Sequence, residues 1–237
     1  MKIKLLTIPL LIFYFYPVTP AQKFDIKDYS FFLPHSFKNK KSFHLAGLAA
    51  AKLPEEIIET EEVFRTPLFF YKIKYGLFEN ASAEAGLETN IITYHFSAGF
   101  HYNIEFDNWG LSAGGSIAYW FGRLKTTNFD AKAIGINFYP GITIGRSFKK
   151  FSVSLKSELI YFLTSTTYNG DLEASDNYDT YSGYSLGLYV EQPLWKDNVI
   201  VIGFRSVWVK FYYPVWAAFP TFDSRLYISE ATVGLIL

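Results

Sequence analysis

The chain has 237 residues, a formal net charge of zero and no cysteine. The balanced charge excludes the basic surface of a nucleic-acid-binding protein, and the lack of cysteine excludes disulfides and thiolate metal sites. Aromatic residues make up 20% of the sequence and charged residues 19%, compared with about 25% charged residues in an average soluble domain. The chain is therefore more apolar and more aromatic than a soluble domain needs to be.

Residues 1–21 have the order of a secretory signal peptide. A basic start at Lys2 precedes an apolar run over residues 5–16, and small residues follow up to Ala21. The run is too short to cross a bilayer comfortably as a helix, so we expect cleavage and a mature chain that begins near Gln22. An uncleaved membrane anchor is the alternative. No later stretch reaches the ~20 apolar residues of a helical span.

Residues 22–41 show no clean period and carry Pro34 and a basic cluster at Lys38, Lys40 and Lys41. We expect an N-terminal periplasmic arm. It either folds back to cap the rest of the protein or remains a mobile terminus.

From residue 42 onward, apolar and polar residues alternate with the period of a β-strand. In residues 93–106 one face is aromatic and aliphatic throughout, and the other carries residues such as His95, Asn103 and Glu105. The aromatic face is suited to lipid, which makes the polar face an interior. We expect ten strands, at 42–52, 67–78, 82–88, 93–106, 110–122, 131–148, 151–165, 181–194, 199–213 and 226–237. Eight or twelve strands are the alternatives if the Ala-rich first candidate is misread. Lys210 breaks the phase of the ninth candidate and suggests a bulge.

The connections alternate in length. Tight turns are expected at 79–81, 107–110, 147–150 and 195–198, and longer loops at 53–66, 124–130, 166–180 and 214–225; the link at 89–92 is a short exception. Outer-membrane barrels have short periplasmic turns and long external loops, and their strand number is even. Ten strands would leave both termini on the periplasmic side.

Aromatic residues gather where strands are predicted to end, as in the interface belts of a membrane barrel. One set lies near the short turns: Phe106, Trp109, Phe148, Phe151 and Trp195. The other lies near the long loops: Phe69, Tyr71, Tyr94, Trp120, Phe121, Tyr161, Tyr212, Tyr213 and Trp216. We therefore predict an all-β fold, an antiparallel up-and-down transmembrane β-barrel over residues 42–237 in the bacterial outer membrane.

The inward face predicts a network of charges in the lumen. Its members are Lys72, Lys74, Glu84, Glu88, Glu105, Lys156, Glu158, Arg205 and Glu230. A barrel of about ten strands is narrow, and a buried charge without a partner carries a large desolvation cost. We expect these groups to pair and fill the barrel; the alternative is a selective conduction path.

The external loops are acidic. One cluster comprises Glu55, Glu56, Glu59, Glu61 and Glu62, and the other Asp171, Glu173, Asp176 and Asp179. We interpret them as solvated surface; the alternative is that divalent cations bridge them to lipid phosphates or to a partner. No metal site and no cofactor are expected, because neither the second cluster nor the four histidines have the spacing of a ligand set.

His95-Phe96-Ser97 is similar to the His-x-Ser element of outer-membrane lipid A deacylases, in which a histidine activates a serine for acyl transfer. The resemblance would give His95 the role of base and Ser97 that of nucleophile. The residue after the serine is Ala98, where the family pattern has asparagine. We expect no enzymatic activity, and a lipid-modifying enzyme is the weakest of three hypotheses.

Residues 75–86 resemble a recurring hairpin of small bacterial outer-membrane barrels, in which an aromatic-Gly strand end leads through a polar turn into a Glu-bearing strand. The resemblance implies the OmpA/OmpX-like superfamily in the loose sense. The chain ends in Leu237 where the usual assembly signal has an aromatic residue. We predict a monomer with a structural, adhesive or surface-interaction role; a narrow channel for a small solute is the alternative. The expected partners are outer-membrane lipid, lipopolysaccharide and the barrel-insertion machinery.

Overall fold

The computed structural model describes residues 25–37, 41–54, 65–126, 129–170, 172–177, 181–195, 198–216 and 225–237. The strands in these ranges are β1 (Ser42–Lys52), β2 (Arg65–Phe78), β3 (Ala81–Thr89), β4 (Thr93–Phe106), β5 (Trp109–Thr126), β6 (Phe129–Ser147), β7 (Ser152–Asn169), β8 (Leu172–Asn177), β9 (Tyr181–Trp195), β10 (Asn198–Val209) and β11 (Leu226–Ile236). Two short 3-10 helices accompany them, η2 (Ile26–Asp28) and η3 (Tyr213–Val215). Among the described helices, none has the length and apolar character needed to cross a membrane.

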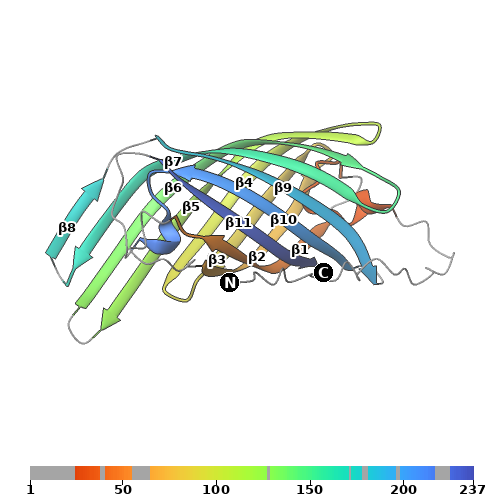
Figure 1. The fold of residues 1–237 in the computed structure, drawn as a ribbon. Helices are drawn as coiled ribbons and strands as arrows, with labels where there is room; N and C mark the ends of the chain where they lie inside the picture. The colour runs from red at the N-terminus through yellow and green to blue at the C-terminus, as the bar shows by residue number, and fades with distance from the viewer. Residues whose placement is uncertain are drawn as a thin grey trace, which may run out of the picture.

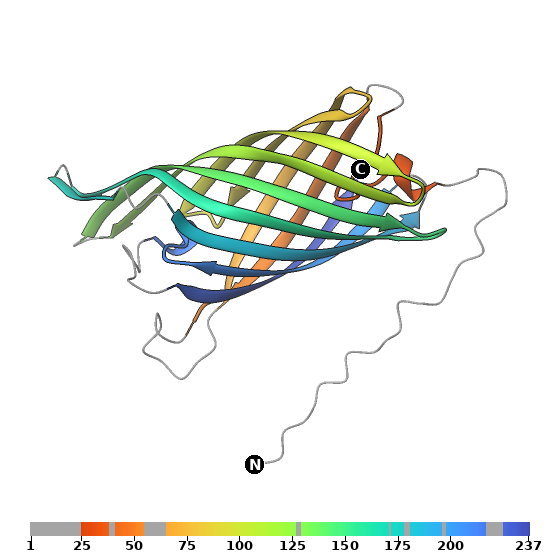
Figure 2. The same cartoon turned by 90° about the horizontal axis from the view of Figure 1, so that it is seen from above.

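Ten of the strands form a closed antiparallel barrel, as predicted (Figures 1 and 2). Each strand from β1 to β7 pairs with the next, β7 continues to β9, and β9 to β11 follow in order. β11 then pairs with β1, from Leu45 opposite Ile236 to Lys52 opposite Ser229, and this closes the ring. β8 is an addition to the ring, because it pairs with the end of β7 beyond the part that pairs with β9.

The prediction of long loops at 124–130 and 166–180 is wrong. Residues 124–130 belong mostly to the β5–β6 hairpin, and residues 166–180 include the end of β7 and β8. The Thr-rich end of β7 has high strand propensity, and β6 and β8 pair with it on both sides. The ninth candidate also ends early: β10 stops at Val209, and Lys210 lies in a bend and not in a bulge.

The outer surface of the barrel is apolar. On β4, Phe96, Phe100 and Tyr102 are 46–51% exposed, whereas Thr93 and Asn103 on the opposite face are at most 1% exposed. A soluble sheet has the reverse arrangement, with its apolar face covered. Hydrocarbon is the surrounding in which such an exterior is stable, so the structure confirms a membrane-type barrel.

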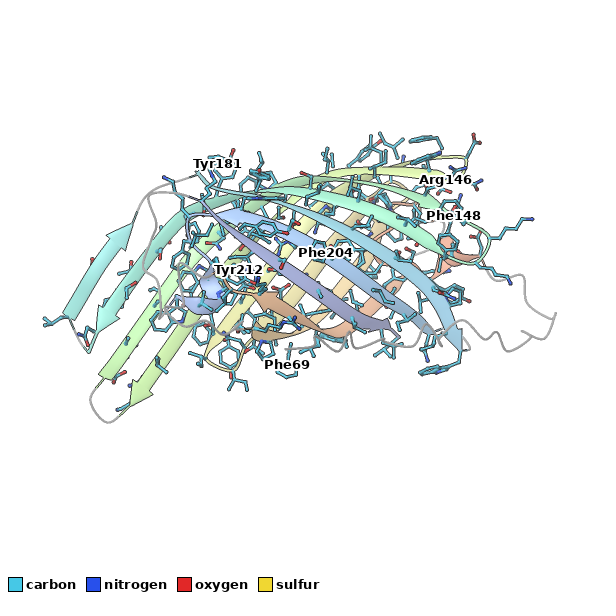
Figure 3. All side chains as sticks on the ribbon, viewed as in Figure 1. Phe69, Arg146, Phe148, Tyr181, Phe204 and Tyr212 are labelled. Atoms are coloured by element: carbon cyan, nitrogen blue, oxygen red, sulfur yellow. The ribbon has the colours of Figure 1, made fainter. Side chains whose placement is uncertain are left out.

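The inside of the barrel is filled at both ends. At the short-turn end, Ile26, Phe31 and Phe37 pack in a cluster with residues of β1, β10 and β11. At the other end, Trp120 and Trp216 pack with Phe162 and Phe211. The prediction that Trp120, Tyr212, Tyr213 and Trp216 belong to the outer aromatic belt is therefore wrong. Trp120 has inward parity on β5, and the chain turns into the lumen after β10, so that Tyr212 lies within the barrel (Figure 3).

Candidate functional site

A polar chamber lies inside the barrel between the two filled ends. Its volume is about 80 Å³, enough for a few water molecules. Charged and aromatic side chains line it, among them Lys72, Glu88, His95, Lys156, Glu158 and Arg205. These residues come from β2, β3, β4, β7 and β10, because alternation along each strand turns every second side chain inward.

Six of the predicted lumen charges form ion pairs in or beside this chamber. Lys72 Nζ lies 2.8 Å from Glu88 Oε1, and Lys156 Nζ lies 2.9 Å from Glu158 Oε1. Arg205 bridges two carboxylates, at 3.2 Å from Glu158 and 3.4 Å from Glu230, its directly opposite neighbour on β11. Pairing of this kind offsets the desolvation of each charge in a narrow lumen.

The other three predicted charges do not join these pairs. Glu84 lies 3.7 Å from the Nε2 atom of His101. Lys74 Nζ donates a hydrogen bond to the backbone carbonyl of Phe31 at 2.8 Å. Glu105 pairs with Lys27 at 2.7 Å. Lys74 and Glu105 thus hold the N-terminal segment.

Residues 25–37, here called the arm, lie inside the barrel at the short-turn end. The carboxylate of Glu191, which is fully buried, holds the arm. One oxygen accepts hydrogen bonds from the backbone N–H groups of Phe31 and Phe32 at 2.7 and 2.9 Å, and the other accepts from Leu33 N–H and the Ser30 hydroxyl. The ring of Phe32 stacks on Tyr189 with centroids 3.8 Å apart.

Sequence reasoning missed Glu191, although a signal for it exists. Glu191 has inward parity on β9, and its directly opposite neighbours are Val201 on β10 and Ser152 on β7. Ser152 donates one hydrogen bond to the carboxylate at 2.9 Å and Val201 has no polar side chain, so the carboxylate needs further donors, and the arm supplies them.

Inward glycines leave room for the arm. A Cβ atom on Gly110 would lie 1.8 Å from the carbonyl oxygen of Pro34. Near this contact, Ser36 N–H donates to Glu105 at 2.9 Å, and Phe37 N–H donates to the carbonyl of Glu79 at 2.8 Å. Burial, together with the positive charge of Lys74, lowers the pKa of His35 in the arm from 6.5 to about 4.

Residues 211–216, here called the cap, fill the opposite end. The hydroxyl of Tyr212 donates to Glu230 and that of Tyr213 to Glu88, each at 2.7 Å. The indole N–H of Trp216 donates to the Thr93 hydroxyl at 3.1 Å, and a Cβ atom on Gly122 would lie 2.0 Å from that indole nitrogen. The cap therefore bonds directly to two carboxylates of the charge network.

The structure places both residues of the His-x-Ser resemblance inside the barrel. His95 is 5% exposed, its Nε2 atom lies 3.2 Å from the hydroxyl of Tyr139, and its ring stacks on Tyr213 at 4.4 Å. His95 and Ser97 both line the chamber inside the barrel, away from the lipid-facing surface. Within the described ranges, no three histidine, aspartate or glutamate side chains are placed to hold a metal ion.

The acidic-loop prediction lies mostly outside the described residues, which include neither 55–64 nor 171 and 178–180. Glu173 is described, and it is exposed on β8. β8 projects from the barrel at the end where the cap lies (Figure 2).

No protein-family model and no curated protein matches this sequence. Solved structures with a similar fold include the translocator domain of the autotransporter NalP from Neisseria meningitidis, at 11% identity and a TM-score of 0.44, covering 85% of this chain and 89% of that one. Neisserial surface protein A has 14% identity and a TM-score of 0.37, with 84% and 99% covered. An active-site mutant of outer membrane phospholipase A from Escherichia coli has 12% identity and a TM-score of 0.40, with 87% and 92% covered. At these distances no function carries over to this chain.

Proposed function

We propose that this protein is a non-conducting barrel of the bacterial outer membrane, with a structural or surface-interaction role at its β8 end. One observation carries the proposal: the chain's own arm and cap fill the two ends of the lumen and leave a cavity of about 80 Å³. A conduction path needs a continuous polar passage, and here aromatic and aliphatic side chains interrupt it at both ends. Short turns at the arm end support a periplasmic location for that end and for both termini.

Conductance in planar bilayers tests the proposal. The full-length protein, refolded and inserted, should show no discrete openings above the background of the bilayer. Steady openings whose size changes in Arg205→Gln or Glu230→Gln would contradict it, because they would place the ionic path through the chamber.

A gated narrow channel is the second candidate, and the way the arm is held favours it. The described arm residues are not part of any strand, and side-chain carboxylates hold them. Removal of residues 25–37 should then produce openings that the full-length protein lacks. If the shortened barrel stays silent, the cap alone seals it and the gated channel is excluded.

We also propose that the protein has no lipid-modifying activity. We further propose, from the resemblance in the hairpin of β2 and β3, that it belongs to the OmpA/OmpX-like superfamily in the loose sense. Mass spectra of lipid A should be unchanged when the protein is expressed. Loss of an acyl chain that Ser97→Ala or His95→Ala restores would contradict this.

A further inference from the structure

Arg123 and Arg146 are exposed on the barrel wall and lie at opposite ends of the barrel. Arg123 on β5 makes two hydrogen bonds to the carboxylate of Asp130, at 3.1 and 2.9 Å, so its charge is compensated within the protein. Arg146 on β6 has no carboxylate partner among the described ion pairs. Its guanidinium carbon instead lies 5.2 Å from the ring centroid of Trp109 and 5.1 Å from that of Phe148.

The register places Arg146 at the edge of the apolar surface. The outward residues before it on β6 include Ile142 and Ile144, which are 58% and 41% exposed. Trp109 lies directly opposite Arg146 on β5, and Phe148 follows two residues later at the turn. Figure 3 shows Arg146 and Phe148 at the opposite end of the barrel from Tyr181.

The surroundings of Arg146 are aromatic and basic. Phe148 stacks on Phe151 with centroids 4.6 Å apart, and the turn between them contains Lys149 and Lys150, both exposed. Aromatic rings attract a guanidinium through their negative faces but carry no full negative charge. A cation at the boundary of hydrocarbon and headgroups therefore takes its counter-charge from the membrane, and a guanidinium matches a phosphate in both charge and geometry.

We propose that Arg146, flanked by Trp109 and Phe148 and supported by Lys149, binds the phosphate of an anionic glycerophospholipid. Short turns lie on the periplasmic side of such barrels, where the facing leaflet consists of phospholipid. The two rings would hold the guanidinium at the depth of the phosphate, and the headgroup would lie beside the turn lysines. This site is on the outer wall, so it does not depend on whether the lumen conducts.

Native mass spectrometry of the full-length protein in detergent tests the site. Dioleoylphosphatidylglycerol and dioleoylphosphatidylcholine are titrated against the wild type, Arg146→Gln and the matched control Arg123→Gln. We expect phosphatidylglycerol to bind the wild type more tightly than phosphatidylcholine, and Arg146→Gln to weaken phosphatidylglycerol binding about fivefold. Arg123→Gln should leave that binding unchanged, and Arg146→Lys should restore part of it.

Three results would overturn the proposal: unchanged binding in Arg146→Gln, an equal loss in Arg123→Gln, or an equal loss for both lipids. Heat-modifiable migration on a gel checks that each variant is folded. If Arg146→Gln does not fold, a salt titration of the wild type replaces it. Phosphatidylglycerol binding should then weaken as the sodium chloride concentration is raised, and binding that does not depend on salt would contradict the proposal.

Discussion

The arm and the cap close the two ends of one lumen by different means. The arm presents backbone N–H groups to a buried carboxylate, Glu191, and adds an ion pair between Lys27 and Glu105. The cap presents side-chain donors, such as the hydroxyls of Tyr212 and Tyr213, to carboxylates of the charge network. In both cases a carboxylate of the barrel wall accepts hydrogen bonds from the segment that fills the lumen.

The two segments also differ in how the chain attaches them. The cap lies between β10 and β11, which pair with each other, so both of its ends belong to the barrel wall. The arm precedes β1 and joins the wall on one side only. Loss of its contacts would therefore free the arm without disrupting a strand, whereas the cap would stay tethered to a wall strand on each side.

The largest expected effect is that of Glu191→Leu. It removes the acceptor of three backbone N–H groups and of the Ser30 hydroxyl, which should weaken docking of the arm by about 3–5 kcal/mol. Because the chain has no cysteine, a single Leu33→Cys reports release of the arm through faster maleimide labelling. Glu105→Gln is the milder control, since its ion pair is partly exposed. Equal labelling of Glu191→Leu and the parent would show that the carboxylate does not hold the arm.

Substitution of Gly110, which contacts the arm, and of Gly122, which contacts the cap, should have different effects at the two ends of the barrel. Gly110→Val pushes against the Pro34 carbonyl and Gly122→Val against the Trp216 indole, each with an overpacking cost of about 3 kcal/mol. Gly110→Val should release the arm and leave the unfolding midpoint nearly unchanged. Gly122→Val should lower that midpoint in urea and leave the arm protected. The reverse pattern would contradict the difference in attachment.

Tyr212→Phe should have a smaller effect on the cap. It removes a buried hydrogen bond of 2.7 Å to the Glu230 carboxylate, worth about 2 kcal/mol in the free energy of unfolding. Tyr227→Phe on the outer surface is the matched control and should change that free energy by less than about 0.5 kcal/mol. Urea titration in detergent micelles measures both changes in the free energy of unfolding. Equal changes would show that the Tyr212 hydroxyl does not hold the cap.

How far the sequence predicted this molecule varies by region. β4 was predicted to the residue, because its alternation is strict over all of Thr93–Phe106. β8 was missed, because its polar residues resemble a loop and its pairing with β7 depends on tertiary context. The inward charges followed from parity, but their partners did not, because the tilt and stagger of a barrel set which strands bring them together.

The positions of the arm and the cap inside the barrel could not be predicted from the sequence, for a different reason. The arm has no period of its own, and its binding site is divided among Glu191, Gly110 and Lys74 on three strands. Trp120 shows the limit of the positional rule: its place near a strand end predicted the outer belt, whereas its parity pointed inward, and parity was correct.

A further expected effect is a pH dependence of the arm. Because the pKa of buried His35 is about 4 and its ordinary value is 6.5, protonation favours the released arm. Docking should be strongest above pH 6.5 and should weaken as the pH falls from 6.5 towards 4. Protease cleavage of the arm, compared at pH 7.5 and pH 5, should increase at the lower pH in the wild type and change less in His35→Gln. An unchanged cleavage rate in the wild type would show that protonation of His35 does not weaken docking of the arm.

The position of the arm inside the lumen is tested most directly by a cysteine pair. A Cβ atom at Gly76 would lie 2.8 Å from the Cβ atom of Phe37, close enough for a disulfide after a small shift. Mild oxidation of Phe37→Cys/Gly76→Cys in intact outer membranes should cross-link most of the protein, while Phe37→Cys/Tyr94→Cys, with its second cysteine on the outer wall, should not cross-link. Cross-linking of the first pair no greater than that of the second would show that the arm does not occupy the barrel.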